Sequence, residues 1–149
     1  MNVGKQRKYA EMTVGEVVET GAITVTEAHI VSFAGLTGDF HPLHTNEEFA
    51  KTTQFGSRIA HGPLIFSMCC GLFVRADPLD SIAFLGMDWQ LLKPVMLGDT
   101  IHVRSTLDSA RVTSAGNRAI IQHTREVINQ RGEVVQKGTT KIMMIVDKA

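Results

Sequence analysis

Pro63-Leu-Ile-Phe-Ser-Met-Cys-Cys-Gly-Leu-Phe-Val74 is apolar nearly all round and begins with a proline. Proline is tolerated in the first turn of a helix, where a missing N–H breaks no intrahelical hydrogen bond. A helix that is apolar on every side is normally buried. The composition also fits a core strand, but the length and the proline start favour a helix. The stretch therefore predicts a buried central helix around which the chain folds.

Strand-like sequence comes after this run. Four stretches rich in β-branched residues are separated by turn signals that contain Gly, Pro, Asn and Asp. The turns are spaced for successive antiparallel hairpins. Trp89 lies in the first stretch, and we expect it in the core rather than on a binding surface. The stretches cover residues 82–92, 100–112, 117–128 and 133–146, and the turns cover residues 93–94, 97–99, 114–117 and 129–132.

A strand and an amphipathic helix are predicted before the central helix. Residues 16–25 are rich in β-branched residues, and Gly21 interrupts them in the manner of a bulge or bend. Thr26 can cap a helix with Glu27 in its positive first turn and apolar residues at helical spacing. The sum of these elements is an α+β domain in which a strongly curved antiparallel sheet surrounds one buried helix.

Length and composition indicate one globular domain. The chain has 149 residues, of which 44% are hydrophobic and 20% are charged, as in ordinary folded proteins. Residues 1–13 are polar and predicted to be only partly ordered, which leaves residues 14–149 as the domain. Cys69 and Cys70 are adjacent within an apolar run, so we expect reduced core thiols rather than a disulfide between them.

The charge balance names no macromolecular partner. Fifteen basic residues match fifteen acidic ones, so no global field favours nucleic acid or an anionic membrane. The basic N-terminus is followed by no apolar segment, and no run reaches the length of a membrane span. A cytoplasmic location is therefore expected.

The chemistry concentrates in Thr37-Gly-Asp-Phe-His-Pro-Leu-His44. Pro42 lies between Asp39 and His44 and restricts His41 to extended conformations, which predicts a rigid, non-helical loop that aims both side chains at one point. A carboxylate and an imidazole that share one water can activate it and return a proton, as hydration of a carbon–carbon double bond requires. An Asp after Gly also commonly closes a turn, so the spacing alone leaves both readings open.

His61-Gly62 supplies a second candidate feature. If Pro63 opens the helix, Gly62 lies at its N-terminus, where a free N–H and the helix dipole can polarise a carbonyl oxygen. Facing a water held by Asp39 and His44, such a donor would stabilise the enolate of a thioester. Glycine before a helix also serves simply as a flexible entry.

These residues carry a resemblance. Phe33-Ala-Gly-Leu-Thr-Gly-Asp-Phe-His-Pro-Leu-His44, Phe49-Ala50 and Arg58-Ile-Ala-His-Gly62 resemble the signature of the MaoC-like dehydratases, also called the (R)-specific enoyl-CoA hydratase or hydratase 2 family. Residues 85–92, 93–95 and 97–101 are also similar, so the likeness covers most of the chain from Glu16 onward. It implies the hot-dog fold, in which a curved antiparallel sheet wraps around a long central α-helix.

The resemblance also implies roles for single residues. Asp39 and His44 match the catalytic pair that activates water for addition to an enoyl thioester, and Gly62 matches the residue whose N–H binds the thioester carbonyl. His41 stands where the family most often has an Asn that supports the loop. Pro42, His61 and Arg58 also fall within the matching motifs, and we expect supporting or substrate-binding roles for them.

The implied protein is a hydro-lyase of fatty acid metabolism that forms a homodimer or a dimer-based oligomer. Its substrate would carry coenzyme A or acyl carrier protein, whose phosphates would seek basic residues such as Lys93, Arg58 or Arg104. No metal or redox cofactor is implied. Three alternatives remain open: a metal site built from Asp39 and the nearby histidines His41, His44 and His61, a hot-dog thioesterase, and a non-catalytic acyl-thioester binding subunit.

Overall fold

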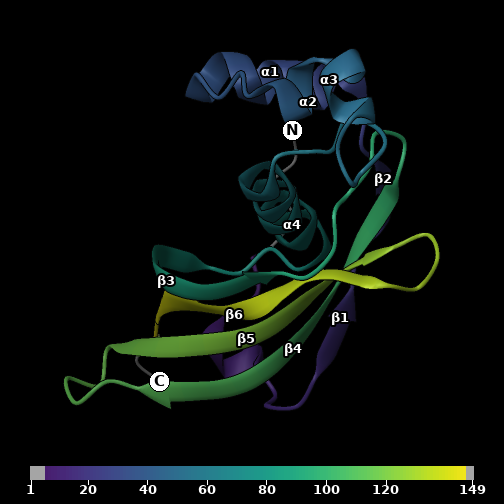
Figure 1. Cartoon of the computed structure of the whole chain (residues 1–149). Coiled ribbons are helices and arrows are strands. Elements are labelled where there is room, and N and C mark those ends of the chain that lie inside the picture. The colour runs from purple at the N-terminus through teal and green to yellow at the C-terminus, as the bar shows by residue number, and fades with distance from the viewer. Residues whose placement is uncertain (1–5, 147–149) are drawn as a thin grey trace.

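A computed structural model describes residues 6–146 of the chain. One antiparallel sheet curves around helix α4, and the shorter helices α1 to α3 form a layer on the other side of α4 (Figure 1). This arrangement confirms the predicted α+β hot-dog architecture. The helices are η1 (Tyr9–Glu11), α1 (Glu27–Thr37), α2 (Pro42–Thr45), α3 (Glu47–Lys51) and α4 (Gly62–Ala76). The strands are β1 (Val17–Glu19), β2 (Ile23–Thr24), β3 (Ser81–Leu91), β4 (Thr100–Val112), β5 (Arg118–Asn129) and β6 (Val134–Ile145).

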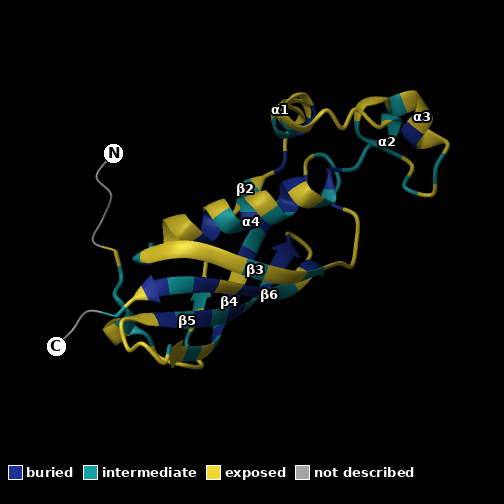
Figure 2. Cartoon of the chain, turned by 90° about the vertical axis from the view of Figure 1, so that its left-hand side faces the viewer, coloured by how far each residue is buried: buried dark blue, intermediate teal, exposed yellow. Residues whose placement is uncertain are grey.

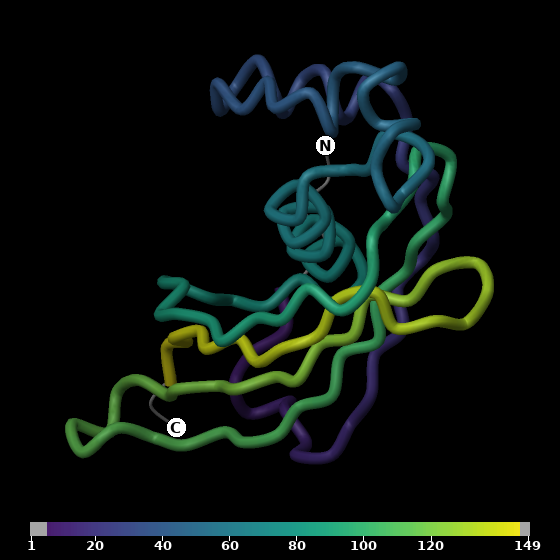
Figure 3. The backbone as a smooth tube through the Cα atoms, viewed as in Figure 1, coloured from purple at the N-terminus to yellow at the C-terminus, as the bar shows by residue number. Residues whose placement is uncertain are grey.

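The strand order is β1-β4-β5-β6-β3, with β2 also paired to β4. The predicted hairpins between β4 and β5 and between β5 and β6 are confirmed. The predicted hairpin between β3 and β4 is wrong, because β3 pairs with β6 at the opposite edge of the sheet (Figure 3). The connection through residues 92–99 crosses the sheet instead of turning back on itself. Gly138 permits the β3–β6 approach, since it faces the backbone of Trp89 without a side chain.

Helix α4 begins at Gly62, as the sequence predicts, but only one of its sides is buried (Figure 2). Its inward face packs against the sheet, whereas Ser67, Gly71 and Val74 are exposed. The apolar composition therefore overstated the burial of this helix. The buried residues are Leu64, Ile65, Cys69, Leu72 and Phe73.

The elements before α4 follow the predicted order with one break. Two short strands, β1 and β2, replace a continuous strand, and Gly21 lies in the gap between them. Helix α1 begins after Thr26, whose N–H donates to Nδ1 of His29 at 3.0 Å, and ends at Gly38 with φ of 80°. That left-handed conformation suits glycine and turns the chain sharply toward Asp39.

The N-terminal segment is partly outside the described residues. Of residues 1–13, the first five are not described, and the rest lies against the domain. The N–H of Arg7 donates to the Pro78 carbonyl at 2.8 Å, and Tyr9 and Met12 pack against the core cluster around Phe73. Within residues 6–146, no helix has both the length and the apolar character needed to cross a membrane.

Candidate active site

The segment from Asp39 to His44 is held by its own hydrogen bonds. A carboxylate oxygen of Asp39 accepts the N–H of His41 at 3.2 Å, and the Thr37 hydroxyl accepts the N–H of Asp39 at 3.3 Å. The prediction of a non-helical loop is wrong for its second half. Pro42 opens the single-turn helix α2, because its fixed φ suits the first helical position, and His44 lies in that turn.

His44 is oriented to act as a base. Its Nδ1 lies 2.8 Å from the carbonyl oxygen of Ile59, which can only accept, so Nδ1 carries the proton and Nε2 keeps the lone pair. Burial lowers the pKa of His44, because desolvation disfavours the charged imidazolium. The imidazole is therefore neutral near pH 7 and ready to accept a proton from water.

His61 completes the constellation. Its ring stacks on that of His44 with centroids 3.8 Å apart, and the side chain is only 1% exposed. Nε2 of His61 donates to the backbone carbonyl of Asp39 at 3.0 Å and lies 4.0 Å from the Asp39 carboxylate. His61 therefore joins the start of α4 to the segment that carries Asp39 and fixes the position of that residue.

His41 does not join this cluster. Its ring centroid is 6.2 Å from that of His44, and its Nδ1 accepts the N–H of Leu43 at 3.2 Å as the N-cap of α2. A side-chain acceptor at this position is what Asn or Asp commonly provides to the start of a helix. The imidazole thus caps the start of α2.

We expect the His41→Asn variant to retain kcat/KM within about threefold, because Asn supplies the same acceptor, while His41→Ala loses about 1 kcal/mol of loop stability. Steady-state kinetics and thermal melting measure both effects. An Asn variant as impaired as the Ala variant would contradict the capping role.

Gly62 presents its backbone N–H at the start of α4, as the predicted oxyanion donor requires. As the first residue of α4 it has an N–H without an intrahelical partner, at the positive end of the helix dipole. Its carbonyl accepts from Nε2 of Gln136 at 3.0 Å, and Gln136 in turn accepts from the Trp89 indole at 2.8 Å. A Cβ at Gly62 would lie 2.5 Å from Cδ1 of Leu91, so glycine also allows the Leu91 side chain to lie close to the start of α4.

Gln136 is a support of Gly62 that the sequence patterns did not indicate. It lies on β6, 74 positions from Gly62, and no local motif marks a polar residue on a strand as a support for a distant helix. Its burial at 2% exposed is visible only in the fold.

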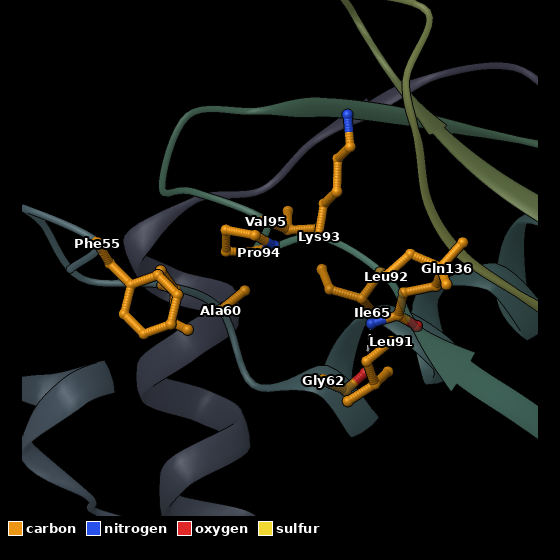
Figure 4. A pocket seen from close by; sticks show the side chains of 11 residues that line it. Phe55, Ala60, Gly62, Ile65, Leu91, Leu92, Lys93, Pro94, Val95 and Gln136 are labelled. Carbon is orange, nitrogen blue, oxygen red and sulfur yellow. Dashed lines mark hydrogen bonds between the residues drawn. The ribbon is translucent and has the colours of Figure 1, made fainter.

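A cavity of about 260 Å³ opens beside Gly62 (Figure 4). Its lining is mostly apolar and comes from the segment before α4, the start of α4, the end of β3, the crossover that follows β3, and β6. In Figure 4 the Lys93 ammonium extends away from Gly62. The lining residues are Phe55, Ile59, Ala60, Gly62, Ile65, Leu91, Leu92, Lys93, Pro94, Val95 and Gln136.

The three basic residues expected near a phosphate differ in their surroundings. Lys93 lines the cavity and pairs with Glu133 at 2.8 Å. The Arg58 guanidinium binds Glu27 through two contacts of 2.7 and 2.8 Å and Glu47 at 3.1 Å, and the contact with Glu27 raises its pKa further. Arg58 therefore ties α1 to α3.

Arg104 lies on β4, where its guanidinium pairs with Glu19 of the neighbouring strand β1 at 2.8 Å. Neither Arg104 nor Arg58 is among the residues that line the cavity. A role in phosphate binding fits Lys93 better than the two arginines.

Asp39, His44 and His61 have potential ligand atoms within 4.8 Å of one another, a grouping that invites comparison with a metal site. His61 uses Nε2–H to donate to the Asp39 carbonyl, so it presents a proton rather than a lone pair on that side. A metal ligand must offer a lone pair. The hydrogen bonds therefore favour water handling over metal binding.

Residues 9–130 match the family described as the MaoC like domain. The chain belongs to this MaoC-like family. The (R)-specific enoyl-CoA hydratase of Rhodospirillum rubrum is 31% identical over 123 residues, which cover 83% of this chain and 82% of that protein. The crystal structure of the MaoC-like dehydratase from Rhodospirillum rubrum superposes with a TM-score of 0.85 at 30% identity, covering 94% of this chain and 97% of the other.

Protein MaoC of Klebsiella aerogenes is 42% identical over 102 residues, which are 67% of this MaoC-like chain. The match covers 30% of the Klebsiella protein, so this chain corresponds to less than a third of that relative's length.

Proposed function

We propose that this MaoC-like protein hydrates the double bond of an enoyl-CoA to give a 3-hydroxyacyl-CoA, and catalyses the reverse dehydration. The observation that carries the proposal is the grouping of Asp39 and a neutral, oriented His44 with His61, the residue that directly precedes Gly62 at the start of α4. The Rhodospirillum rubrum relative, named as an (R)-specific enoyl-CoA hydratase, supports the same reaction class.

The proposed mechanism places one water between the Asp39 carboxylate and Nε2 of His44. His44 withdraws a proton from this water while its oxygen attacks the β-carbon of the enoyl group. The negative charge that develops on the thioester oxygen is stabilised by the N–H of Gly62 and the start of α4. The Asp39–His44 pair then returns a proton to the α-carbon, so the net reaction is addition of water.

Two residues near this pair serve as supports in the proposal. His61 holds the backbone of Asp39, and Pro42 opens the turn that carries His44. The cavity beside Gly62 is the proposed site for the thioester end of a coenzyme A or acyl carrier protein substrate, with Lys93 beside the phosphates.

Hydration of crotonyl-CoA tests the proposal directly. We expect the enone absorbance to fall without release of free thiol, because water adds to carbon rather than to the thioester carbonyl. Release of thiol would instead support a thioesterase. Absence of both changes across a panel of enoyl thioesters would support a non-catalytic binding subunit.

We further propose a homodimer formed through β3. This strand is the outer edge of the sheet and is exposed along most of its length (Figure 2). An unpaired edge with apolar side chains is a template for pairing with another chain. Met87 is 56% exposed at its centre. The other exposed apolar residues of β3 are Ile82, Phe84, Leu85 and Leu91.

A charge at the centre of this edge is expected to convert the dimer to a monomer. We expect Met87→Glu to halve the mass in sedimentation analysis, because the two charges would meet across a buried interface. Val14→Glu is the matched control, since Val14 is 57% exposed in a turn before β1. An unchanged mass for Met87→Glu would place the interface elsewhere.

A further inference from the structure

Arg125 is a buried cation without an ion-pair partner. It lies on β5, faces α4 and is 4% exposed. Among residues 6–146, no carboxylate oxygen lies within 4.0 Å of its guanidinium. The acid that influences it from a distance is Asp77, which pairs with Arg7 at 3.4 Å. Arginine stays charged inside proteins and is seldom fully buried unless paired, so the position of Arg125 favours an anionic partner.

The immediate contacts of Arg125 do not neutralise it. The guanidinium carbon lies 3.9 Å from the centre of the Phe73 ring, an attractive cation–π contact that leaves the net charge in place. The thiol of Cys69 lies beside it, and burial raises the pKa of that thiol to about 12, so the sulfur is neutral. Nε of Arg125 has no hydrogen-bond partner.

Three neighbours on the same face of the sheet also have unused polar atoms. Ser105 on β4 lies opposite Arg125 in the sheet. His123 lies two residues before Arg125 on β5, and Thr140 on β6 lies opposite His123. The Ser105 hydroxyl, Nδ1 of His123 and the Thr140 hydroxyl are buried without a partner. Burial and the positive charge of Arg125 lower the pKa of His123 to about 3, so it is neutral. The cluster offers donors around a single uncompensated cation.

Helix α4 and strand β6 both line the cavity beside Gly62, and both extend from there to this cluster. On α4, Gly62 and Ile65 line the cavity, and Cys69 and Phe73 follow at helical spacing beside Arg125. The helical rise separates Gly62 from Cys69 by about 10 Å.

On β6, alternate residues lead from the cavity to the cluster around Arg125. Gln136 lines the cavity, Gly138 pairs with Arg125, and Thr140 pairs with His123. From Gln136 to Thr140 the strand rises by about 13 Å. Ile65 and Cys69 are fully buried between the helix and the sheet. A ligand that extends between α4 and β6 therefore displaces their side chains.

We propose that Arg125, with Ser105, His123 and Thr140, binds a carboxylate at the far end of the substrate's acyl chain. This inference rests on the proposed hydratase function. With its thioester at Gly62, the acyl chain runs between α4 and β6, and its terminal carboxylate accepts hydrogen bonds from the guanidinium and the neighbouring donors. The cluster thereby selects dicarboxylic acyl groups over acyl groups that end in a methyl.

The test compares enoyl-CoA pairs of equal chain length that end either in a carboxylate or in a methyl group. We expect the wild type to show kcat/KM about tenfold or more higher for the carboxylate member of the pair whose length matches the path. Arg125→Met should reverse this preference and Arg125→Lys should keep part of it. Arg111→Met is the matched control, since it removes an exposed arginine from β4.

A second measurement needs no turnover. Acetate, compared with chloride at equal ionic strength, should raise the melting temperature of the wild type but not of Arg125→Met, because only the wild type binds it. If methyl-ended substrates turn over, carboxylate-ended ones are not preferred, and acetate does not raise the melting temperature, the carboxylate site is overturned and the hydratase function stands. Acetate protection without substrate preference would overturn the acyl assignment in favour of a free small anion. Acetate protection without turnover of any substrate would count against the hydratase function and keep the anion site.

Discussion

Asp39→Asn and His44→Gln are each expected to lower kcat for crotonyl-CoA hydration by about 100- to 10 000-fold. Asn cannot replace the carboxylate that holds the water with His44, and Gln cannot supply the neutral imidazole lone pair left on Nε2 by the hydrogen bond from Nδ1 to the Ile59 carbonyl. Both substitutions conserve approximate shape, so the hydrogen bonds that shape the loop are largely kept. Stopped-flow or steady-state loss of the enone absorbance measures the effect.

The control for these variants is His102→Gln, which removes an imidazole from β4, away from the cavity-lining residues. It should retain wild-type turnover, and circular dichroism should show all three variants folded. Turnover by Asp39→Asn and His44→Gln within a few fold of the wild type would remove the pair from the mechanism. The double variant should be little worse than the singles, because the two residues act on one water.

Gly138→Ala is expected to lower the free energy of unfolding by about 3 kcal/mol or more. A Cβ at Gly138 would lie 2.8 Å from the Cα of Trp89 and closer still to the carbonyl oxygen of Asp88. Backbone atoms cannot rotate away as a side chain can, so β3 must separate from β6. Urea denaturation measures the loss, and turnover should fall with it because β3 and β6 supply Leu91 and Gln136 to the cavity.

Gly71→Ala provides the matched comparison. Gly71 is exposed on α4, and nothing lies within 4 Å of a Cβ placed there. Alanine has a higher helix propensity than glycine by about 1 kcal/mol, so this variant should be as stable as the wild type or more so. Equal stability of Gly138→Ala and the wild type would mean that the two strands can separate at little cost.

Local patterns predicted the elements and the candidate catalytic pair. The proline start defined α4 and marked Gly62 before it, turn signals defined β4 to β6, and the loop motif marked Asp39 and His44. Each of these depends on residues close together in the chain, which is why the sequence was sufficient. The helical turn that begins at Pro42 escaped prediction, because extended backbone before a proline does not determine the conformation of the residues after it.

Long-range pairing could not be predicted in the same way. Nothing near β3 indicates that it pairs with β6 rather than with β4, since that choice depends on a glycine in another strand. The inward direction of Arg125 was equally hidden, because its charge normally assigns it to solvent although the strand period puts it on the same face as Ile121. Gln136 joins Gly62 only after both pairings exist.

The crossing of the chain from β3 to the far edge of the sheet also has a consequence for the order of folding. β3 is synthesised before β4, but its partner β6 is the last strand among the described residues. Contacts of such long sequence separation form slowly, because the loop must close before they stabilise anything. On the ribosome, Gly62 therefore emerges long before β6, and the cavity beside Gly62 stays incomplete until that strand docks.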